Sequence, residues 1–215
     1  MAMRIAHGAH RPAGGHAGCR SDASATLEHR MRIDHSRKRR VSIVAAARQA
    51  LIAGSVASVL STAALALAGR RQNRSAAAPI NAVSHWYWGD EALHRQGASA
   101  RHTLAGYLTH HGASVFWAGA YALAAMDRPA LRTPVGIAWG GLATSALACF
   151  VDFRLTPERL TPGFEHRLSR PALAGVYAAF AIGLALGAAV AQAREPRERT
   201  LRDASARRRR ADRRA

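Results

Sequence analysis

The chain has few residues of several kinds, and each scarcity narrows what the protein can be. Only two cysteines, Cys19 and Cys149, occur in 215 residues, which argues against a disulfide framework. Acidic residues number 13 against 31 Lys and Arg, and Lys38 is the only lysine. No C-x-x-C, G-x-S-x-G, P-loop or G-x-G-x-x-G pattern is present. We therefore predict no cofactor, and an enzymatic role is the less favoured one.

Four long segments contain no Lys or Arg, and each is about as long as a bilayer is thick. A helix needs about 20 mostly apolar residues to cross the hydrocarbon core of a membrane. The four segments hold 21, 23, 20 and 23 residues and are Gln49–Gly69, Thr103–Ala125, Pro134–Phe153 and Pro171–Ala193. They predict an all-α integral membrane protein, with a bundle of four transmembrane helices in a domain covering residues 41–193.

The basic residues are concentrated at the two ends of the chain. Of the 31 Lys and Arg, ten lie in residues 1–48 and ten in residues 194–215. Basic residues next to spans stay on the cytoplasmic side, so four spans place both tails in the cytoplasm. The connection 126–133 is then also cytoplasmic, and the connections 70–102 and 154–170 lie outside. The arginine and alanine bias favours a bacterial source, and hence the inner membrane.

The basic tails could contact either nucleic acid or lipid. Clustered arginine neutralises nucleic-acid phosphate, but residues 1–40 and 194–215 contain no Phe, Trp or Tyr on which bases could stack. Attraction to anionic lipid head groups explains the arginines more simply. We predict a disordered basic tail over residues 1–40 because it has little apolar surface to bury. We also predict an Arg-rich cytoplasmic tail over residues 194–215, with lipid rather than nucleic acid as its partner.

The first span has a competing interpretation as a signal peptide. The basic run Arg37–Arg40, an apolar core and a small-residue ending are typical of such a peptide. The 21 residues of the span exceed the usual core of about 7–15 residues, which favours an uncleaved signal anchor. Met31, just upstream of the basic run, is an alternative start of the chain.

A short segment between the first two spans is rich in aromatic residues. Trp86, Tyr87 and Trp88 are of the types that settle at the depth of the lipid head groups. We expect Ser84–Arg95 to form a short interfacial helix.

The same segment carries candidate metal ligands, His85, Asp90 and His94. Asp90 and His94 are four residues apart and would share one face of a helix. Glu91 and His94 have the E-x-x-H spacing of di-iron bundles, although such a site needs a second pair and further Glu residues. A solvated salt bridge from Glu91 to Arg95 explains the pattern equally well.

Three ionisable residues lie inside the predicted spans, where burial is costly. His110 and His111 belong to the second span, and Asp152 lies at the end of the third. His111 shares a polar stripe with Tyr107, which we expect to face the bundle interior. Antiparallel packing brings Asp152 into the same half of the membrane as the histidines, so we expect Asp152 to contact His110 or His111. The cluster would either orient two helices or handle a proton, a metal or a ligand.

Glycines in the third and fourth spans follow a spacing that lets helices approach closely. Gly136 and Gly140, and likewise Gly183 and Gly187, fit the small-xxx-small pattern. They favour a compact bundle, and they allow self-association or a membrane partner protein. The leading hypothesis is therefore a multi-pass membrane protein with a structural or accessory role. The alternative is a proton- or metal-handling membrane protein.

Three motifs resemble a family of small bacterial inner-membrane proteins with a domain of unknown function. They are HWYWGDEA (His85–Ala92), SARHTLAGYLTHHGASVFWA (Ser99–Ala118) and VDFRLTPERLTPGFEHRLSR (Val151–Arg170). The resemblance implies a multi-span integral membrane protein and no particular activity. It covers roughly half of the chain and omits both basic tails.

Overall fold

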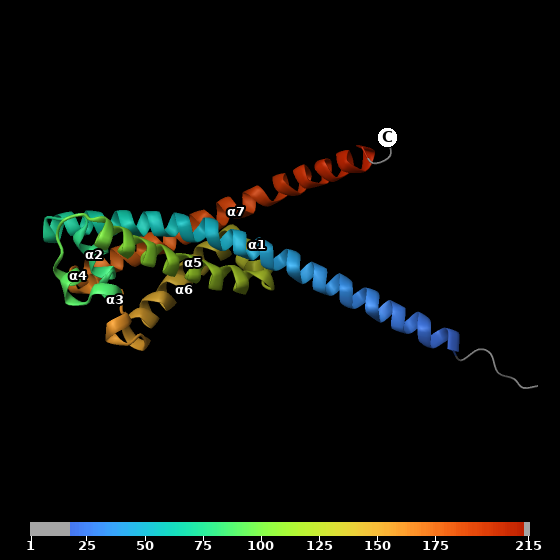
Figure 1. Ribbon diagram of the computed structural model, residues 1–215, viewed down its shortest axis with the longest axis horizontal. Helices are drawn as coiled ribbons and strands as arrows, with labels where there is room; N and C mark the ends of the chain where they lie inside the picture. Colours follow the sequence, from blue (N-terminus) through green and yellow to red (C-terminus); the bar gives the residue numbers. More distant parts are fainter. Residues whose placement is uncertain (1–17, 213–215) are drawn as a thin grey trace, which may run out of the picture. The chain divides into compact units, whose positions relative to one another are not determined.

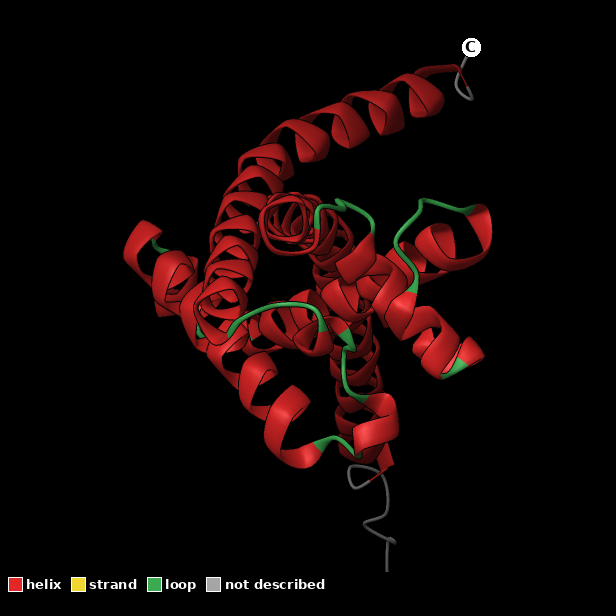
Figure 2. Ribbon diagram, turned by 90° about the vertical axis from the view of Figure 1, so that its left-hand side faces the viewer, coloured by secondary structure: helices red, strands yellow, loops and turns green. Residues whose placement is uncertain are grey.

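The computed structural model describes residues 18–212, and it describes side chains from residue 43 to residue 194. The chain divides into two compact units, Met1–Ser42 and Ile43–Ala215. The described residues form helices joined by loops and contain no β-strand (Figure 2). The all-α class predicted from the sequence is therefore confirmed for the described part of the chain.

Helix α1 (Gly18–Asn73) starts well before the first predicted span. Residues 18–40 of the segment predicted to be disordered belong to this helix, and residues 1–17 lie outside the described ones. The stretch from Arg20 to Arg40 contains no Gly or Pro. An apolar helix that has already formed extends into such a stretch without a new nucleation step. The predicted lipid contacts of the tails fall on side chains outside the described ones, apart from Arg194.

Three helical segments are long and apolar enough to cross a membrane: Ile43–Asn73, Pro134–Leu155 and Arg170–Arg194. They contain the first, third and fourth predicted spans. The second predicted span corresponds to α5 (Ala105–Met126), which has 22 residues. Helix α5 is long enough, but His110 and His111 lower its apolar character, and it is not among the three. The prediction of a membrane protein is supported, and the fourth span is left as a proposal.

Helices α1 and α7 (Arg170–Asp212) are antiparallel and in close contact. Gly183 of α7 faces Ala57 of α1, and Gly187 faces Ala53, so residue numbers rise on one helix as they fall on the other. A Cβ atom on either glycine would overlap the Cα atom of the facing alanine. The Gly183–Gly187 spacing therefore serves close packing within the chain.

Helix α5 also lies antiparallel along α1. A Cβ atom built on Gly54 would lie 2.5 Å from the Cα atom of Val115, so only a residue without a side chain fits there. The contacts between the two helices join Ala50 with Gly119, Gly54 with Val115, and Ser61 with His110. These pairs place α5 beside the apolar part of α1 over about three turns.

Helix α6 (Pro134–Phe150) begins at the residue predicted from the sequence. The hydroxyl of Thr133 caps the helix by accepting a hydrogen bond from Gly136 N at 3.1 Å. A π-helical turn, η3 (Val151–Leu155), continues α6. The helix packs on α7, where Ser145 Oγ donates to Tyr177 O at 2.7 Å. In Figure 1, α6 diverges from α5 towards its C-terminal end.

Short 3-10 turns make up part of the connections between the long helices. The turn η2 (Pro129–Arg132) joins α5 to α6. The turns η4 (Glu158–Leu160) and η5 (Phe164–His166) lie between η3 and α7. Gly163, which precedes η5, has φ +86°. A Cβ atom there would lie 2.5 Å from Ala82 O, so the loop lies directly on the segment that follows α1.

Four short elements connect α1 to α5: α2 (Ala78–Val83), α3 (His85–Trp88), α4 (Asp90–His94) and the π-helical η1 (Ala100–Leu104). All six residues of α2 are buried. The single helix predicted over Ser84–Arg95 is two helices in the structure. Gly89 separates them with φ +57°, a conformation that residues with a Cβ atom rarely adopt.

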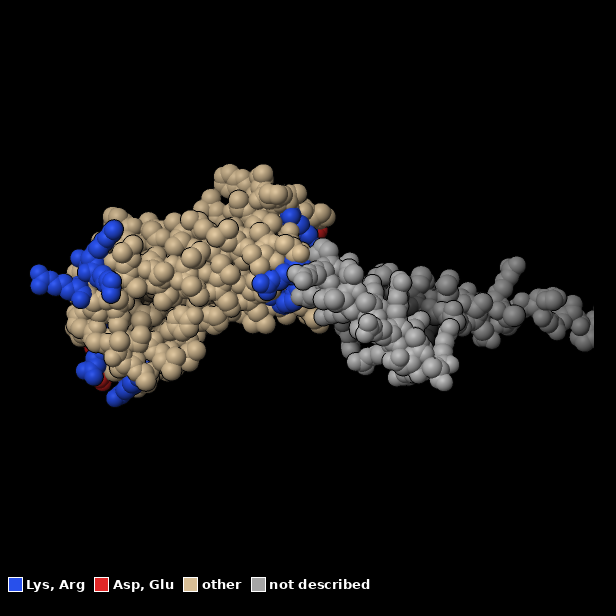
Figure 3. Space-filling model, turned by 90° about the horizontal axis from the view of Figure 1, so that it is seen from above, with Lys and Arg blue, Asp and Glu red and all other residues tan. Residues whose placement is uncertain are grey.

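The surface of the second unit suits a lipid environment. Large apolar side chains on the long helices are more than half exposed, among them Val59, Leu108, Phe116, Trp139 and Ile182. Water would make such a surface unfavourable, and lipid would not. Figure 3 shows Lys and Arg at the two ends of the described surface, with an uncharged band between them. This pattern is typical of a protein that spans a bilayer.

Candidate functional site

A cavity of about 310 Å³ is lined by residues of α5, α6, the turn η3 and α7. Its wall is mostly apolar and includes side chains from α1, α5, α6 and α7. Two of the intramembrane residues singled out in the sequence, His110 and Asp152, line it together. The other side chains that matter for its chemistry are Ser61, Trp86, Thr109, Ser114, Phe116, Trp117, Thr156, Phe164, Tyr177 and Phe180.

His110 is held by Ser61 of the neighbouring helix. Ser61 Oγ lies 2.8 Å from His110 Nε2 and 2.8 Å from Ala57 O. One hydroxyl hydrogen cannot serve both partners. When Ser61 donates to Ala57 O, it accepts from His110, which then donates through Nε2. In the neutral ring, Nδ1 of His110 is then a hydrogen-bond acceptor.

Asp152 is held by a tyrosine on α7. Tyr177 donates through its hydroxyl to Asp152 Oδ2 at 2.6 Å. A hydroxyl that donates to a carboxyl group favours the ionised form of that group. Asp152 lies in the π-helical turn η3, a type of turn that is often found at functional sites.

The predicted contact between Asp152 and a histidine is not formed. Among the described residues, no hydrogen bond or ion pair joins Asp152 to His110 or His111; its partner is Tyr177 and that of His110 is Ser61. Both side chains line the same cavity, but each is engaged by a partner on another helix.

Tyr107 and His111 lie beside each other, away from the cavity wall. Their ring centroids are 5.8 Å apart. Tyr107 packs against a second apolar cluster that includes Leu65 and Ile80. The Nδ1 atom of His111 is buried without a hydrogen-bond partner among the described residues. The four residues of the predicted cluster thus form two pairs. His110 and Asp152 line one cavity, and Tyr107 contacts His111 outside it.

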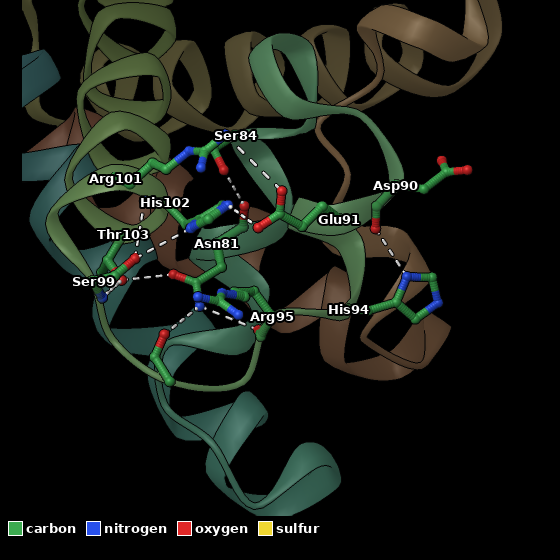
Figure 4. A network of polar contacts seen from close by, with 11 residues as sticks. Asn81, Ser84, Asp90, Glu91, His94, Arg95, Ser99, Arg101, His102 and Thr103 are labelled. Atoms are coloured by element: carbon green, nitrogen blue, oxygen red, sulfur yellow. Dashed lines mark hydrogen bonds and ion pairs between the residues drawn. The ribbon is translucent and has the colours of Figure 1, made fainter.

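A separate polar network organises the segment between α1 and α5 (Figure 4). Its centre is Asn81 of α2, which is fully buried. The Asn81 amide nitrogen donates to Arg95 O at 3.2 Å and to Gly97 O at 3.0 Å. Thr103 Oγ1 donates to Asn81 Oδ1 at 2.6 Å. One side chain therefore ties together the end of α4, the following loop and η1.

Charged groups surround this network. Glu91 Oε1 lies 3.6 Å from His102 Nε2, and Glu91 Oε2 lies 4.0 Å from Arg101. His102 is buried, and Ser99 Oγ lies 3.2 Å from its Nδ1 atom. The Arg101 guanidinium lies 5.2 Å from the centroid of the Trp88 ring. Glu91 thus pairs with Arg101 and lies beside His102, and the salt bridge predicted to Arg95 is not found among the described residues.

The predicted metal ligands do not form a set. His94 Nδ1 lies 2.9 Å from the backbone oxygen of Asp90, and Figure 4 shows the Asp90 carboxylate pointing away from that ring. His85 Nδ1 lies 2.9 Å from Ala82 O. His85 and Asp90 line a second cavity of about 550 Å³ with Glu158 and His166, and His94 does not. No group of three or more His, Cys, Asp or Glu in the described part of the chain is placed to hold a metal ion.

Sequence reasoning missed Ser61, Tyr177 and Asn81. Uncharged polar residues in apolar helices are common and therefore drew no attention. Comparing how deep each polar residue lies in the membrane would have found Ser61. Ser61 lies eight residues before the end of the first predicted span, and His110 lies seven residues after the start of the second. In antiparallel helices these positions have the same depth in the membrane.

A scan against protein-family models, a search of the curated proteins and a search of the solved structures find no match to this chain.

Proposed function

We propose that this chain is a four-span protein of the bacterial inner membrane that holds a small ligand in the cavity lined by His110 and Asp152. The observation that carries the proposal is the meeting of a histidine and a carboxylate on the wall of one largely apolar cavity. Ligand sites combine an apolar wall with a few polar groups that orient the ligand. Ionisable groups inside a membrane are costly, and they are retained mainly where they serve a function.

The fourth span is supported by the way α5 packs. Three of its contacts with α1 join residues 50, 54 and 61 of the apolar part of α1 to residues 119, 115 and 110 of α5. A helix that lies along a membrane span over this length crosses the same hydrocarbon layer. Its 22 residues extend for about 33 Å, enough to cross the layer. Leu108, Phe116 and Leu123 are more than half exposed, as a face in contact with lipid would be.

Four spans support placing both tails on the cytoplasmic side. The two tails hold 20 of the 31 Lys and Arg, and the connection that includes η2 adds Arg128 and Arg132. The opposite connections hold nine. The bias of basic residues towards the cytoplasm therefore favours this orientation over its reverse. The proposed location in the bacterial inner membrane also rests on the resemblance of three motifs to small proteins of that membrane.

The structural or accessory role is less well supported than the ligand site. Self-association through the glycines of α7 would need a free glycine face, but Gly183 and Gly187 are covered by α1. Gly140 is covered by the ring of Tyr121, and Gly136 lies on Ala130 of its own connection. The predicted small-residue faces are thus used within one chain.

A proton-handling role is a second candidate, favoured by the same two residues. His110 and Asp152 could exchange a proton through a molecule in the cavity between them. In vesicles containing the purified protein and a pH-sensitive dye, Asp152→Asn and His110→Gln would each slow the decay of an imposed pH gradient. Decay at the wild-type rate in both variants would contradict this role.

The ligand site can be tested by filling the cavity. Ala113 of α5 lines it, whereas Ala120 of the same helix does not; both residues are exposed. In lipid nanodiscs, phenylbutanol should bind saturably to the wild type and to Ala120→Phe. Ala113→Phe should bind at least about 10-fold more weakly, because the new ring occupies the site. Tryptophan fluorescence of Trp86 and Trp117 follows the binding, with empty nanodiscs correcting for partition into lipid.

Two results would contradict the proposed ligand site. One is the absence of saturable binding to the wild type. The other is equal binding to Ala113→Phe and Ala120→Phe, which would place the compound elsewhere on the protein.

A further inference from the structure

We infer that the cavity between α5 and α6 selects a lipophilic amine, in its protonated form, over an alcohol or an acid of the same carbon skeleton. The inference rests on the proposed ligand site and names the chemical class that the site would take. It depends on three features of the wall: its hydrogen-bond donors, its single carboxylate and its aromatic rings.

The hydroxyl groups on the wall direct their hydrogens to the backbone. Each of four hydroxyls donates to a carbonyl oxygen four or five residues earlier in its own segment. The pairs are Ser61 with Ala57 at 2.8 Å, Thr109 with Ala105 at 3.0 Å, Ser114 with His110 at 2.8 Å, and Thr156 with Val151 at 3.0 Å. In this geometry only the lone pairs of the hydroxyls are left for a ligand.

The other polar side chains on the wall are engaged in a similar way. Trp86 Nε1 donates to Thr161 O at 2.9 Å, and Tyr177 donates to Asp152 at 2.6 Å. When Ser61 donates to Ala57 O, His110 donates through Nε2 to Ser61, and its Nδ1 atom is left as an acceptor. Apart from the indole N–H of Trp117, the described side-chain donors on the wall have an acceptor within the protein. The wall therefore offers acceptors, and a complementary ligand must bring donors.

The charge of the wall points to a cation. Among the described residues that line the cavity, Asp152 is the only acidic one, and none is Lys or Arg. The hydroxyl of Tyr177 donates to Asp152 Oδ2, and such a bond favours the ionised form of the carboxyl group. The positive charge of an ammonium group would balance the negative charge of Asp152. Its N–H groups would donate hydrogen bonds to the acceptors on the wall. A carboxylate ligand would add a second negative charge and no donor.

The remaining wall suits an apolar body attached to the amine. Rings from four parts of the chain line it: Trp86, Phe116, Trp117, Phe164, Tyr177 and Phe180. Aromatic faces attract cations and also pack on apolar groups. The volume of about 310 Å³ lies at the lower end of the range of small-molecule sites. Phe116 is 68% exposed on the face of α5 that we assign to lipid, so a molecule dissolved in the bilayer reaches the opening directly.

The first experiment compares three probes with one skeleton: phenylbutylamine, phenylbutanol and phenylbutyrate. Binding to the wild-type protein in nanodiscs of zwitterionic lipid is measured by tryptophan fluorescence at neutral pH. The amine should bind at least about 10-fold more tightly than the alcohol, since it adds a charge-assisted hydrogen bond to Asp152. Phenylbutyrate should bind more weakly than the alcohol.

The second experiment removes the charge of the wall. Asp152→Asn keeps an oxygen that can accept the hydrogen bond from Tyr177, so the fold of the site is retained. The variant should bind phenylbutylamine about 10-fold more weakly than the wild type and phenylbutanol within about 3-fold of it. Asp127→Asn is the matched control, because Asp127 ends α5 on the opposite side and does not line the cavity. It should bind all three probes as the wild type does.

The outcomes separate this inference from the proposed ligand site. If phenylbutanol binds and Ala113→Phe abolishes it, but the amine is no tighter than the alcohol, the ligand site stands and the selectivity for amines is wrong. Equal loss of amine and alcohol binding in Asp152→Asn would also overturn the selectivity, since Asp152 would then act through the shape of the site. If none of the three probes binds, the ligand site itself fails.

Discussion

Two glycines on α7 differ sharply in their surroundings although they share one helix. A Cβ atom on Gly187 would overlap the Cα atom of Ala53, whereas nothing lies within 4 Å of a Cβ atom on Gly175. Helix–helix packing in lipid depends on such close approach, because lipid supplies no hydrophobic driving force between helices. The stability of the α1–α7 pair is therefore concentrated at a few small residues.

Replacing each glycine by alanine should have different effects on stability. Gly187→Ala should lower the free energy of unfolding by about 1–3 kcal/mol, because the added methyl group pushes α7 away from α1. Gly175→Ala should leave it unchanged or raise it by up to about 1 kcal/mol, as alanine is the better helix former. Unfolding in increasing fractions of sodium dodecyl sulfate, followed by circular dichroism, measures both. Equal stability of the two variants would show that α1 and α7 do not pack as closely as described.

At the scale of single residues, the sequence identified the ionisable groups but not their partners. The cost of burying charge in lipid makes His110 and Asp152 stand out in any apolar segment. Their partners, Ser61 and Tyr177, depend on which helices are neighbours and on how α6 diverges from α5. Residue spacing within one helix carries neither kind of information, so the predicted contact between Asp152 and a histidine was wrong.

Among the elements, the segment between α1 and α5 depends on one side chain for its conformation. Asn81 makes three hydrogen bonds to Arg95, Gly97 and Thr103, and these groups belong to the loop that leads into α5. Asn81→Ala removes all three and leaves buried polar groups without partners, which costs about 1–3 kcal/mol for each group that stays dry.

That loss should expose the loop to protease. Arg95 and Arg101 are sites for trypsin, and cleavage after Arg95 in Asn81→Ala should be at least about 10-fold faster than in the wild type, because opening the loop becomes easier. The control is Gln72→Ala, which removes an exposed contact with Ser169 and leaves the loop in place. Mass spectrometry of the fragments measures both rates. Equal rates in Asn81→Ala and wild type would mean that the network does not hold the loop.

The role of α5 as a span can be tested at its two ends. Gly97 precedes the helix and Ala130 follows it, so the two residues lie on opposite sides of the membrane only if α5 crosses it. In a background of Cys19→Ser and Cys149→Ala, a membrane-impermeant maleimide should label Gly97→Cys in intact spheroplasts. It should label Ala130→Cys only after lysis. Labelling of both positions in intact spheroplasts would leave three spans.

The long elements were predictable because their signal is composition over some twenty residues. The predicted third span begins at Pro134, as α6 does, and the predicted first, third and fourth spans lie within the three apolar helical segments. The short elements were not predictable in the same way. Gly89 breaks the expected interfacial helix, and α2, which holds Asn81, is a buried piece of six residues. Tertiary contacts rather than periodicity decide such segments.

For the molecule as a whole, the decisive property is the chemical nature of its outer surface. In water, an exposed apolar surface of this extent would drive aggregation. In lipid, the same residues cost nothing, and the Lys and Arg at the two ends of the described surface would lie at the depth of the head groups. The charges and the apolar residues are thus separated along the helices rather than between an interior and an exterior.

This separation predicts how the protein behaves when cells are fractionated. After lysis and high-speed centrifugation, the chain should stay in the pellet through washes with high salt and with alkaline carbonate, which remove proteins held by charge alone. It should move to the supernatant only when detergent replaces the lipid around the apolar helices, because three of them are long enough to cross the bilayer. Immunoblots of each fraction, with a peripheral membrane protein as the control, measure the partition. Release of most of the chain by carbonate would mean that these helices pack against protein instead of lipid, and the proposed four-span arrangement would then be wrong.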